Sequence, residues 1–523
     1  MLTQRKILVS LLSVLLVVAT GVPAGAKDFV PEGPSLNGTG KVAFLIQDDR
    51  SLPMKYIARD LNGQDEAKLG NQWCRSYTTE TCRLEKGVKL NVIASLGKCK
   101  ADETACVENV KIFRSGEAKA NAEFLLETSG KELPANNLGA PIGGGTTIWR
   151  APGITSQAGV DIYAVNVSLF FSIIDGERVV YGDLSSTVSP VSEILDPRYR
   201  PGDIGSNDRN GVTWWYHDNG SIPGYDCFAT DFGKCWMRAN FSDGTRVELE
   251  MRLPRSLSGW LHGRLDNTEL SITPISNTAN RVVVAADPVV VPIMYAVVDQ
   301  KHKNPIVQEV LDMKTSGGGF NGGIGGLEWK LYGPDWDPTR TLVKHFADQV
   351  GDKAVATQTT WRFKTIWANT GNRCLDARGK LIGLVTTNAL TYSAGPPRFS
   401  NGFLNYATAG LHKLPDGQVA LGSYNLIIRS ETARCLYGFT NAPVSATITV
   451  AGDGDRTIAT TTVGEKNGWL KLAANGFTFS EKTIRVRITQ KRSTITCVST
   501  TTPVRTRKVT GLSPRCPVGF VKR

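Results

Sequence analysis

The sequence of 523 residues lacks the short motifs that mark the common hydrolases and nucleotide-binding enzymes. Gly-Lys-Ser/Thr, His-Glu-x-x-His and Gly-x-Ser-x-Gly are all missing, which excludes a P-loop, a zincin helix and a nucleophile elbow. A Gly-x-Gly-x-x-Gly match begins at Gly317, but residues 327–330 and then Pro334 follow it instead of a helix that could bind a pyrophosphate. We therefore expect no nucleotide, no other cofactor and no metal site, and we identify no catalytic residue.

Histidine is also rare. The chain has five, at positions 217, 262, 302, 345 and 412, and we expect most of them to be structural. A Ser-His-Asp set or a pair of catalytic carboxylates would have to be assembled by the fold, and no particular set stands out in the sequence. Whether the chain is an enzyme therefore stays open, and a non-enzymatic role is favoured.

No Cys-x-x-Cys pair occurs, so zinc ribbons and thioredoxin-type redox motifs have no support. The ten cysteines are even in number and all follow residue 26, a pattern typical of disulfides in an oxidising compartment. Three successive pairs lie only seven or eight positions apart, which suits hairpins and tight loops. Sequential pairing is the simplest of several possible connectivities, and it predicts Cys74–Cys82, Cys99–Cys106, Cys227–Cys235, Cys374–Cys435 and Cys497–Cys516.

Long apolar runs are missing except at the N-terminus. Arg5 and Lys6 precede the apolar residues 7–18, and small residues at 24–26 suit a signal peptidase. An uncleaved anchor is the alternative, but the run is shorter than the about 20 apolar residues of a membrane span. We predict a cleaved signal peptide over residues 1–26 and a secreted or extracellular, envelope-associated protein.

The most apolar later stretch, residues 282–298, contains Asp287, Pro288 and Pro292. These residues are costly or disruptive in lipid, so buried paired strands explain the stretch better. We therefore expect no transmembrane span in the mature chain.

Acidic residues are almost missing from the end of the chain. Eleven lysines and arginines follow residue 480, against the single acid Glu481, so this segment carries +10 of the net charge of +12. The signal carries the other +2, and residues 27–480 sum to zero. A neutral body with a cationic end predicts contact with a polyanion. The candidate polyanion-binding residues are Arg505, Arg507, Lys508, Arg515, Lys522 and Arg523.

The polyanion could be an anionic wall polymer, a lipid surface or extracellular nucleic acid, and a tail that only aids solubility is the alternative. Nucleic acid is less favoured, because stacking platforms need several aromatic rings and the tail has only Phe520. The predicted disulfide of the tail would close a loop and remove about 3 kcal/mol of unfolded-state freedom. The predicted disulfide therefore implies that the tail has a defined shape in which its basic side chains are exposed.

Most of the body shows strand patterns. Residues 246–253 alternate strictly between charged and apolar side chains. Asp-Gly pairs at Asp175, Asp243 and Asp416 predict tight turns, because these residue types tolerate positive φ. The fold class expected is mainly β, with several β-sandwich-like modules, few short helices and disulfide bonds.

Helical pattern is sparse, and two short helices are expected near residues 304–313 and 337–350, where Pro305 and the Asp337-Pro338 pair mark the starts. Residues 316–326 include seven glycines, and we expect a loop or linker there. The predicted regions are a signal peptide (1–26), a β-rich region with two cystine loops (27–190), a second with one (191–303), a helix-plus-strand region (304–415), a small β-sandwich (416–490) and a basic disulfide-closed tail (491–523).

The densest aromatic cluster lies around the Cys227–Cys235 pair. Aromatic faces beside Asp and Asn side chains suit a sugar ring, although aromatics next to a disulfide also often fill a core. The ligand-binding candidates are Trp214, Trp215, Tyr216, His217, Asp218, Asn219, Asp226, Asp231 and Trp236.

From about residue 359 onward, the sequence resembles modules at the ends of exported actinobacterial proteins. The resemblance rests on Trp361-Arg362-Phe363-Lys364-Thr365-Ile366 and on residues 383–389, 402–406, 409–412, 414–417, 434–439, 494–497, 509–511 and 514–520. Lysine is common in such tails where this chain has Arg505, Arg507 and Arg515. The resemblance covers about a third of the chain and implies export rather than any particular chemistry, and no family is assigned to residues 27–350.

Three functional hypotheses follow from the sequence. The first is an exported, non-enzymatic adhesion or binding protein held at the cell envelope when its cationic tail contacts an anionic polymer or glycan. The second is a secreted carbohydrate-binding or carbohydrate-active protein that uses the region from Trp214 to Trp236. The third is a subunit of a larger assembly, because the sequence leaves the oligomeric state open.

Overall fold

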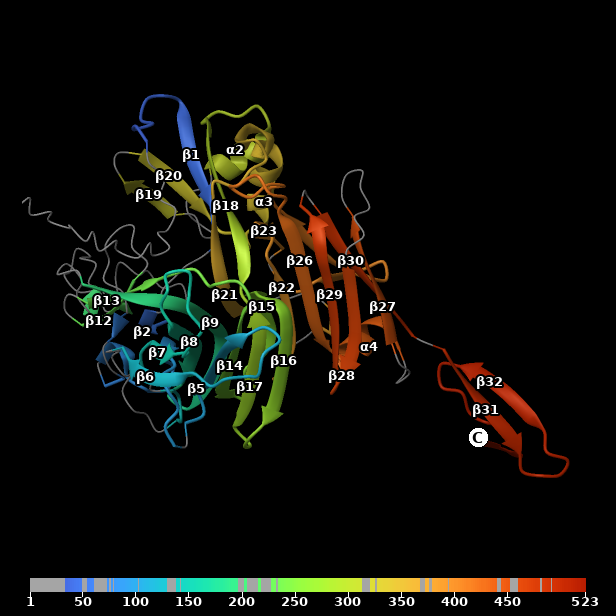
Figure 1. Ribbon diagram of the computed structural model, residues 1–523. Helices are drawn as coiled ribbons and strands as arrows, with labels where there is room; N and C mark the ends of the chain where they lie inside the picture. The colour runs from blue at the N-terminus through green and yellow to red at the C-terminus, as the bar shows by residue number, and fades with distance from the viewer. Residues whose placement is uncertain are drawn as a thin grey trace, which may run out of the picture.

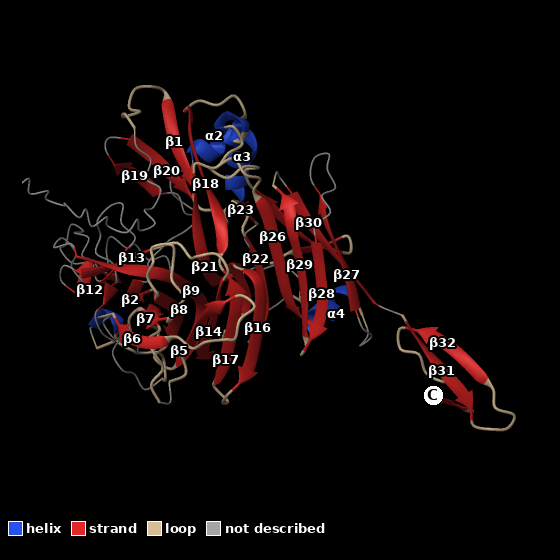
Figure 2. Cartoon of the chain, viewed as in Figure 1, coloured by secondary structure: helices blue, strands red, loops and turns tan. Residues whose placement is uncertain are grey.

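The computed structural model describes residues 33–48, 54–60, 73–74, 77–78, 80–101, 103–128, 138–141, 143–195, 202–204, 215–217, 227–231, 234–312, 320–324, 327–366, 372–375, 379–393, 395–439, 444–451, 460–479, 482–490 and 492–523. Strands dominate this part of the chain and the helices are short (Figure 2), which confirms the predicted mainly β fold class.

Most strands belong to one network of 21 strands linked by backbone pairing (Figure 1). Its members are β1 (Lys41–Ile46), β2 (Met54–Arg59), β3 (Trp73–Cys74), β4 (Lys89–Ser95), β6 (Glu123–Glu127), β7 (Thr147–Arg150), β8 (Ile162–Ile174), β9 (Arg178–Leu195), β10 (Gly202–Ile204), β11 (Trp215–His217), β12 (Cys227–Asp231), β13 (Lys234–Arg238), β15 (Gly259–Arg264), β18 (Val289–Asp299), β19 (Phe320–Ile324), β20 (Leu327–Tyr332), β21 (Ala356–Ile366), β22 (Leu381–Thr387), β26 (Leu421–Arg429), β28 (Thr460–Lys466) and β29 (Trp469–Thr478).

Three smaller sheets complete the β structure. The first sheet consists of four strands, β5 (Cys106–Arg114), β14 (Thr245–Pro254), β16 (Asp266–Pro274) and β17 (Ala279–Asp287). The second consists of five strands, β23 (Thr391–Tyr392), β24 (Arg398–Ser400), β25 (Phe403–Ala409), β27 (Val444–Ala451) and β30 (Lys482–Gln490). The third consists of three strands, β31 (Ser493–Ser499), β32 (Thr506–Gly511) and β33 (Phe520–Lys522). The helices are α2 (Pro305–Asp312), α3 (Asp337–Phe346) and α4 (Ser430–Tyr437), with short 3-10 turns at Glu80–Cys82 and Asp348–Val350.

Strand β14 shows why the alternating pattern folds as it does. Its apolar face, represented by Val247 and Leu249, is fully buried against β7, β8 and β9 in the largest core. Its charged face is also covered, because Glu248 binds Lys111 and Lys119 from the neighbouring chain segments. The four-stranded sheet and the large network therefore pack as a sandwich, as predicted for this fold class.

A second sandwich lies at the C-terminal side of the body. Strands β22, β26 and β29 of the network pack on β25, β27 and β30 of the five-stranded sheet, and the core between them includes Tyr406, Leu426 and Ile484. Helices α2 and α3 cover one face of β1, β18 and β20, where Phe44 and Phe346 lie in one core.

Four of the predicted disulfides are present: Cys74–Cys82, Cys99–Cys106, Cys374–Cys435 and Cys497–Cys516. The side chains of the fifth predicted pair, Cys227 and Cys235, lie outside the described part. The predicted turn at Asp175-Gly176 is confirmed, with φ of 57° and 65°, and joins β8 to β9.

The glycine-rich segment differs from the expectation. Residues 320–324 form β19, which pairs antiparallel with β20 from Phe320↔Leu331 to Ile324↔Leu327. Glycine is unfavourable in strands, but backbone pairing needs no side chain, and the hairpin supplies the partner strand. The prediction of a loop is therefore wrong for these five residues.

The predicted regions share sheets across their boundaries. β5 from residues 27–190 pairs with β14 from residues 191–303, and β15 pairs with both β21 and β22. The division into regions remains a prediction about the sequence rather than a description of separate packing units.

Candidate functional site

The predicted polyanion-binding residues lie on the third small sheet, which we call the C-terminal sheet (residues 492–523). It pairs with no other strand of the described chain, and Figure 1 shows it set apart from the body. The disulfide Cys497–Cys516 joins its central strand β31 to the segment between β32 and β33. Cys497 is fully buried although the sheet is small, so the cystine forms the centre of this unit.

Backbone register places cations in rows across the sheet. Cys497 lies opposite Arg507 on β32 and opposite Lys522 on β33, and directly opposed residues share a face. Thr496 lies opposite Lys508, and the Arg523 backbone N–H donates to the Thr496 carbonyl at 2.9 Å. Both faces of the C-terminal sheet therefore carry basic side chains.

All six predicted cations are exposed, and none has an ion-pair partner in the part of the chain that the structure describes. No Asp or Glu occurs from residue 482 to the end. The set is Arg505, Arg507, Lys508, Arg515, Lys522 and Arg523. In contrast, Glu108 on the body is held between Arg252 and Arg281, and hydrogen bonds from Arg281 hold the pKa of its carboxyl below the ordinary value.

The predicted sugar-binding region is described only in part. Trp215, Tyr216 and His217 form β11, and Asp231 ends β12, but only the backbone of these residues is described. Trp214, Asp218, Asn219 and Asp226 lie outside the described residues.

Trp236 is the one candidate of this region with a described side chain. Only 9% of it is exposed, and it packs with Ile148, Ala164 and Val191 in a small core. The Trp236 ring is therefore covered by apolar side chains, and its role in ligand binding stays a prediction.

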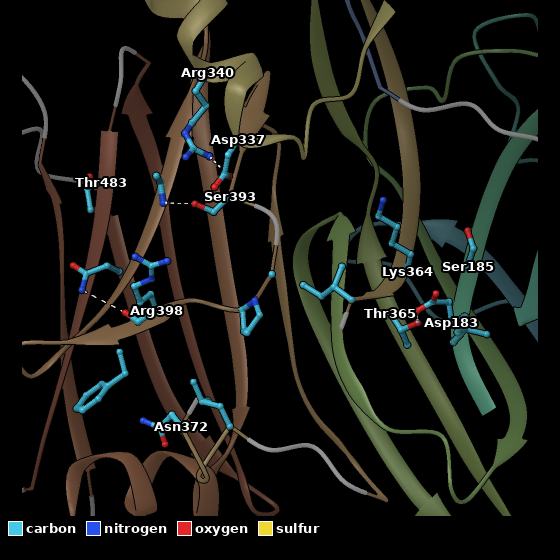
Figure 3. Close-up of a pocket in the computed structure, with 18 residues that line it drawn as sticks. Asp183, Ser185, Asp337, Arg340, Lys364, Thr365, Asn372, Ser393, Arg398 and Thr483 are labelled. Atoms are coloured by element: carbon cyan, nitrogen blue, oxygen red, sulfur yellow. Dashed lines mark hydrogen bonds and ion pairs between the residues drawn. The ribbon is translucent and has the colours of Figure 1, made fainter. Parts of the chain in front are cut away.

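A large cleft, not anticipated from the sequence, lies between the two sandwiches and has a volume of about 850 Å³. Figure 3 shows Asp183, Ser185, Lys364 and Thr365 on one wall and Ser393, Arg398 and Thr483 on the opposite wall. Helix α3 contributes Asp337 and Arg340. The volume is within the range of small-molecule sites.

Most charges of the cleft are neutralised by neighbours. Arg340 donates to Asp337 at 2.8 Å, and Lys364 pairs with Asp335. Asp183 accepts a hydrogen bond of 3.3 Å from the Thr365 hydroxyl, and burial raises the pKa of its carboxyl. The remaining polar lining consists of hydroxyls, amides and the guanidinium of Arg398, so the cleft offers mainly neutral hydrogen-bonding groups beside one cation.

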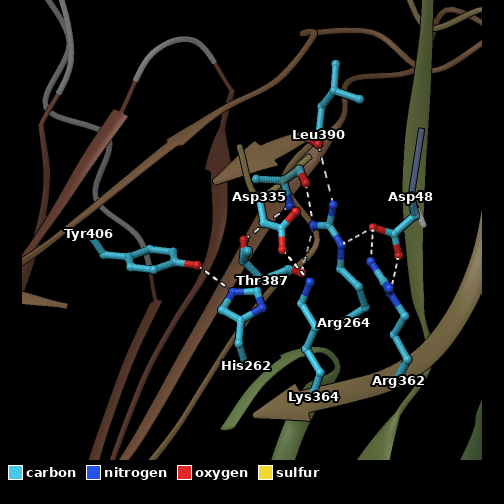
Figure 4. Close-up of polar contacts among 10 residues, drawn as sticks. Asp48, His262, Arg264, Asp335, Arg362, Lys364, Thr387, Leu390 and Tyr406 are labelled. Atoms are coloured by element: carbon cyan, nitrogen blue, oxygen red, sulfur yellow. Dashed lines mark hydrogen bonds and ion pairs between the residues drawn. The ribbon is translucent and has the colours of Figure 1, made fainter. Parts of the chain in front are cut away.

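A buried ion cluster lies behind the cleft (Figure 4). Asp48, at the end of β1, accepts hydrogen bonds from Arg264 Nε at 2.9 Å and from Arg362 Nε and Nη2 at 2.7 and 2.8 Å. Burial alone would raise the pKa of Asp48, but the charges of Arg264 and Arg362 lower it to about 2. Arg264 also donates to the carbonyls of Thr387, Ala389 and Leu390, so it fixes the turn after β22.

His262 extends this cluster towards the second sandwich. Its Nε2 and the Tyr406 hydroxyl share a hydrogen bond of 2.6 Å, and its ring stacks on Tyr392 at 4.2 Å. Burial of the ring lowers the pKa of His262 well below 6.5, and the positive charge of Arg264 lowers it further. A neutral, fully packed imidazole with a tyrosine partner is a structural group in this arrangement, as expected for most histidines of the chain.

The residues of the cleft and of the ion cluster were missed because they come from distant positions. Asp48 and Arg362 are 314 residues apart, and Arg264 lies between them in the sequence. None of them belongs to a recognisable motif, although three segments of the resemblance, residues 361–366, 383–389 and 402–406, contribute to this region.

Comparison with protein families and with curated proteins finds no match to this sequence. Among the described residues, no helix is long and apolar enough to cross a membrane. Within the same residues, no group of three or more His, Cys, Asp or Glu side chains is arranged to share a metal ion.

Proposed function

We propose that this chain is an exported, non-enzymatic protein that binds at the cell envelope and is retained there by its C-terminal sheet. The observation that carries the proposal is the display of the six predicted cations, all exposed and with no Asp or Glu among residues 492–523, on a disulfide-closed sheet separate from a neutral body. Four described disulfides also support export, because such bonds form and persist in oxidising compartments.

The spacing of the cations suits a repeating anionic partner. Rows on both faces allow several phosphates or carboxylates to be bound at once, and each contact releases counterions into solution. Such binding weakens with salt, because the Debye length falls from about 10 Å at 0.1 M to about 3 Å at 1 M. The proposal therefore predicts retention that depends on ionic strength.

The test compares three forms of the protein on washed cell envelopes. Removal of residues 491–523 should release the protein into the medium, and moderate salt should release the intact protein. The triple variant Arg505→Ser, Arg507→Ser and Lys508→Ser should bind about 100-fold more weakly, at about 1 kcal/mol per cation.

The matched control removes three cations from the body, at Arg255, Lys301 and Lys303, which are exposed. This control should bind like the wild type. Retention that is independent of salt, or equal loss in the body control, would contradict the proposal.

A second candidate function is glycan binding, and the cleft favours it independently of the aromatic region. Neutral hydroxyl and amide groups in a cavity of about 850 Å³ suit a ligand rich in hydroxyls. Arg398→Ala and Thr483→Ala should then weaken binding to envelope glycans, with Arg255→Ala as the control. Trp215→Ala and Asp226→Ala test the aromatic region separately, and glycan binding unchanged in all four variants would exclude both sites.

A further inference from the structure

The fold brings two loops of the C-terminal sheet together at one end. Strand β31 ends at Ser499, and residues 500–505 lead into β32; β33 begins at Phe520, directly opposite Ser499. The Thr500 backbone N–H and hydroxyl both donate to the Gly519 carbonyl, at 2.9 and 3.1 Å. The turn at residues 517–519 therefore lies against the loop at residues 500–505, and we call these two segments with Val521 the loop end.

The loop end exposes apolar side chains with nothing packed over them. Val504 is 71% exposed, Val521 is 55% exposed and Val518 is fully exposed. Three of the fourteen large apolar side chains exposed in the described chain lie at the loop end, whereas Leu512 follows β32 at the opposite end of the sheet. Single exposed valines are ordinary, but their concentration at one end of a small sheet is not.

Cations surround these valines along the chain and across the sheet. Arg505 follows Val504, and Lys522 and Arg523 follow Val521. Arg507 shares a sheet face with Lys522 across Cys497. An apolar tip surrounded by basic side chains is the arrangement by which peripheral proteins enter the headgroup region of an anionic bilayer.

We propose that the loop end docks on an anionic lipid surface, with Val504 and Val518 among the acyl boundary and the adjacent cations on lipid phosphates. This inference rests on the proposed function, because it assigns the partner of the same C-terminal sheet. A dissolved polymer would account for the cations, but it has no apolar phase that would favour exposed valines. The disulfide Cys497–Cys516 holds the turn at residues 517–519 against the sheet, so the loop end has its shape before it contacts the lipid surface.

The test measures binding of the full mature protein to vesicles of phosphatidylcholine with about one third phosphatidylglycerol, and to immobilised heparin as a lipid-free polyanion. The double variant Val504→Ser and Val518→Ser should bind the vesicles at least about tenfold more weakly, because each buried valine contributes substantially to transfer from water. Its binding to heparin should be unchanged. The control Val180→Ser and Val419→Ser alters two exposed valines of the body and should bind vesicles like the wild type.

A gain-of-function variant guards against misfolding as an explanation. Val518→Phe should tighten vesicle binding several-fold and leave heparin binding unchanged, because a larger apolar group enters the lipid.

Vesicle binding that is equal in wild type and in both loop-end variants would overturn the lipid assignment and leave the proposed function intact, with a polymer as partner. Equal loss of heparin and vesicle binding in the double variant would also overturn it. Failure of the wild type to bind envelopes, heparin and vesicles would instead remove the proposed function.

Discussion

The substitution Asp48→Asn tests the buried ion cluster that joins the N-terminal strand to the rest of the body. Asp48 is 2% exposed and Arg264 is 1% exposed, so neither group can exchange its partner for water. Asparagine keeps the size of the side chain and one acceptor oxygen, but it removes the negative charge. The buried Arg264 guanidinium then loses the carboxylate that neutralises its charge.

The expected cost follows from two independent considerations. Removal of one partner from a buried ion pair destabilises a protein by about 3–5 kcal/mol, because the remaining charge is uncompensated. The pKa of Asp48 is lowered from 3.8 to about 2, and this difference corresponds to roughly 2 to 3 kcal/mol of pH-linked stability. We therefore expect the free energy of unfolding to fall by about 3–5 kcal/mol at pH 7.

The sign of the pH dependence gives a second readout. The pKa of Asp48 is lower in the folded state, so the folded chain binds fewer protons than the unfolded chain between pH 4 and pH 2. The stabilisation is complete above about pH 4 and is lost as the pH falls towards 2. The Asp48→Asn variant should lack this part of the acid sensitivity.

Urea unfolding followed by tryptophan fluorescence measures both effects. Asp337→Asn is the control, because its partner Arg340 lies only three residues away and Asp337 is 63% exposed; this change should cost less than about 1 kcal/mol. A loss below about 1 kcal/mol in Asp48→Asn, or acid sensitivity equal to that of the wild type, would refute the account of the cluster.

Two further predictions concern His262 and Cys374–Cys435, the described disulfide whose cysteines lie farthest apart in the sequence. Burial of the ring lowers the pKa of His262 below 6.5, and the charge of Arg264 lowers it further. Below pH 6.5 the unfolded chain therefore binds a proton that the folded chain does not. The free energy of unfolding should then fall by about 1.4 kcal/mol for each pH unit. His262→Gln should flatten this slope in urea titrations at pH 7, 6 and 5, and a slope that persists unchanged would contradict the assignment. Replacement of both Cys374 and Cys435 by serine opens a link between positions 61 apart and should cost about 4 kcal/mol. A wild-type-like urea midpoint in this double variant would show that the disulfide does not constrain the unfolded chain.

Local features were predictable because neighbouring residues determine them. The alternation in residues 246–253 predicted β14, and its apolar positions are buried. Four disulfides follow sequential pairing. In three of them the cysteines are 7 to 19 positions apart and meet across hairpins or short loops, whereas Cys374 and Cys435 are 61 positions apart. Helix α3 begins at Asp337 as its Asp-Pro start predicted.

Features that join distant segments were not predictable. The glycines at 322 and 323 indicated a loop, but β20 provides hydrogen-bond partners that the local pattern does not reveal. The cleft depends on how the two sandwiches meet, since Asp183 and Arg398 reach it from different sheets. The aromatic region shows the same limit, because Trp236 is in a core and the pattern alone permitted either role.

The sequence alone determined the β character of the chain, its cystines and the cationic character of its C-terminal end, because composition, periodicity and short spacings act locally. Only the tertiary structure decided that Asp48 meets Arg264 and Arg362, that a polar cleft separates the sandwiches, and that Val504 and Val518 share one end of a sheet. The physical reason is that charge pairing and surface clustering depend on distances of a few ångströms between side chains. Those distances are fixed by strand register and sheet packing, not by position along the chain.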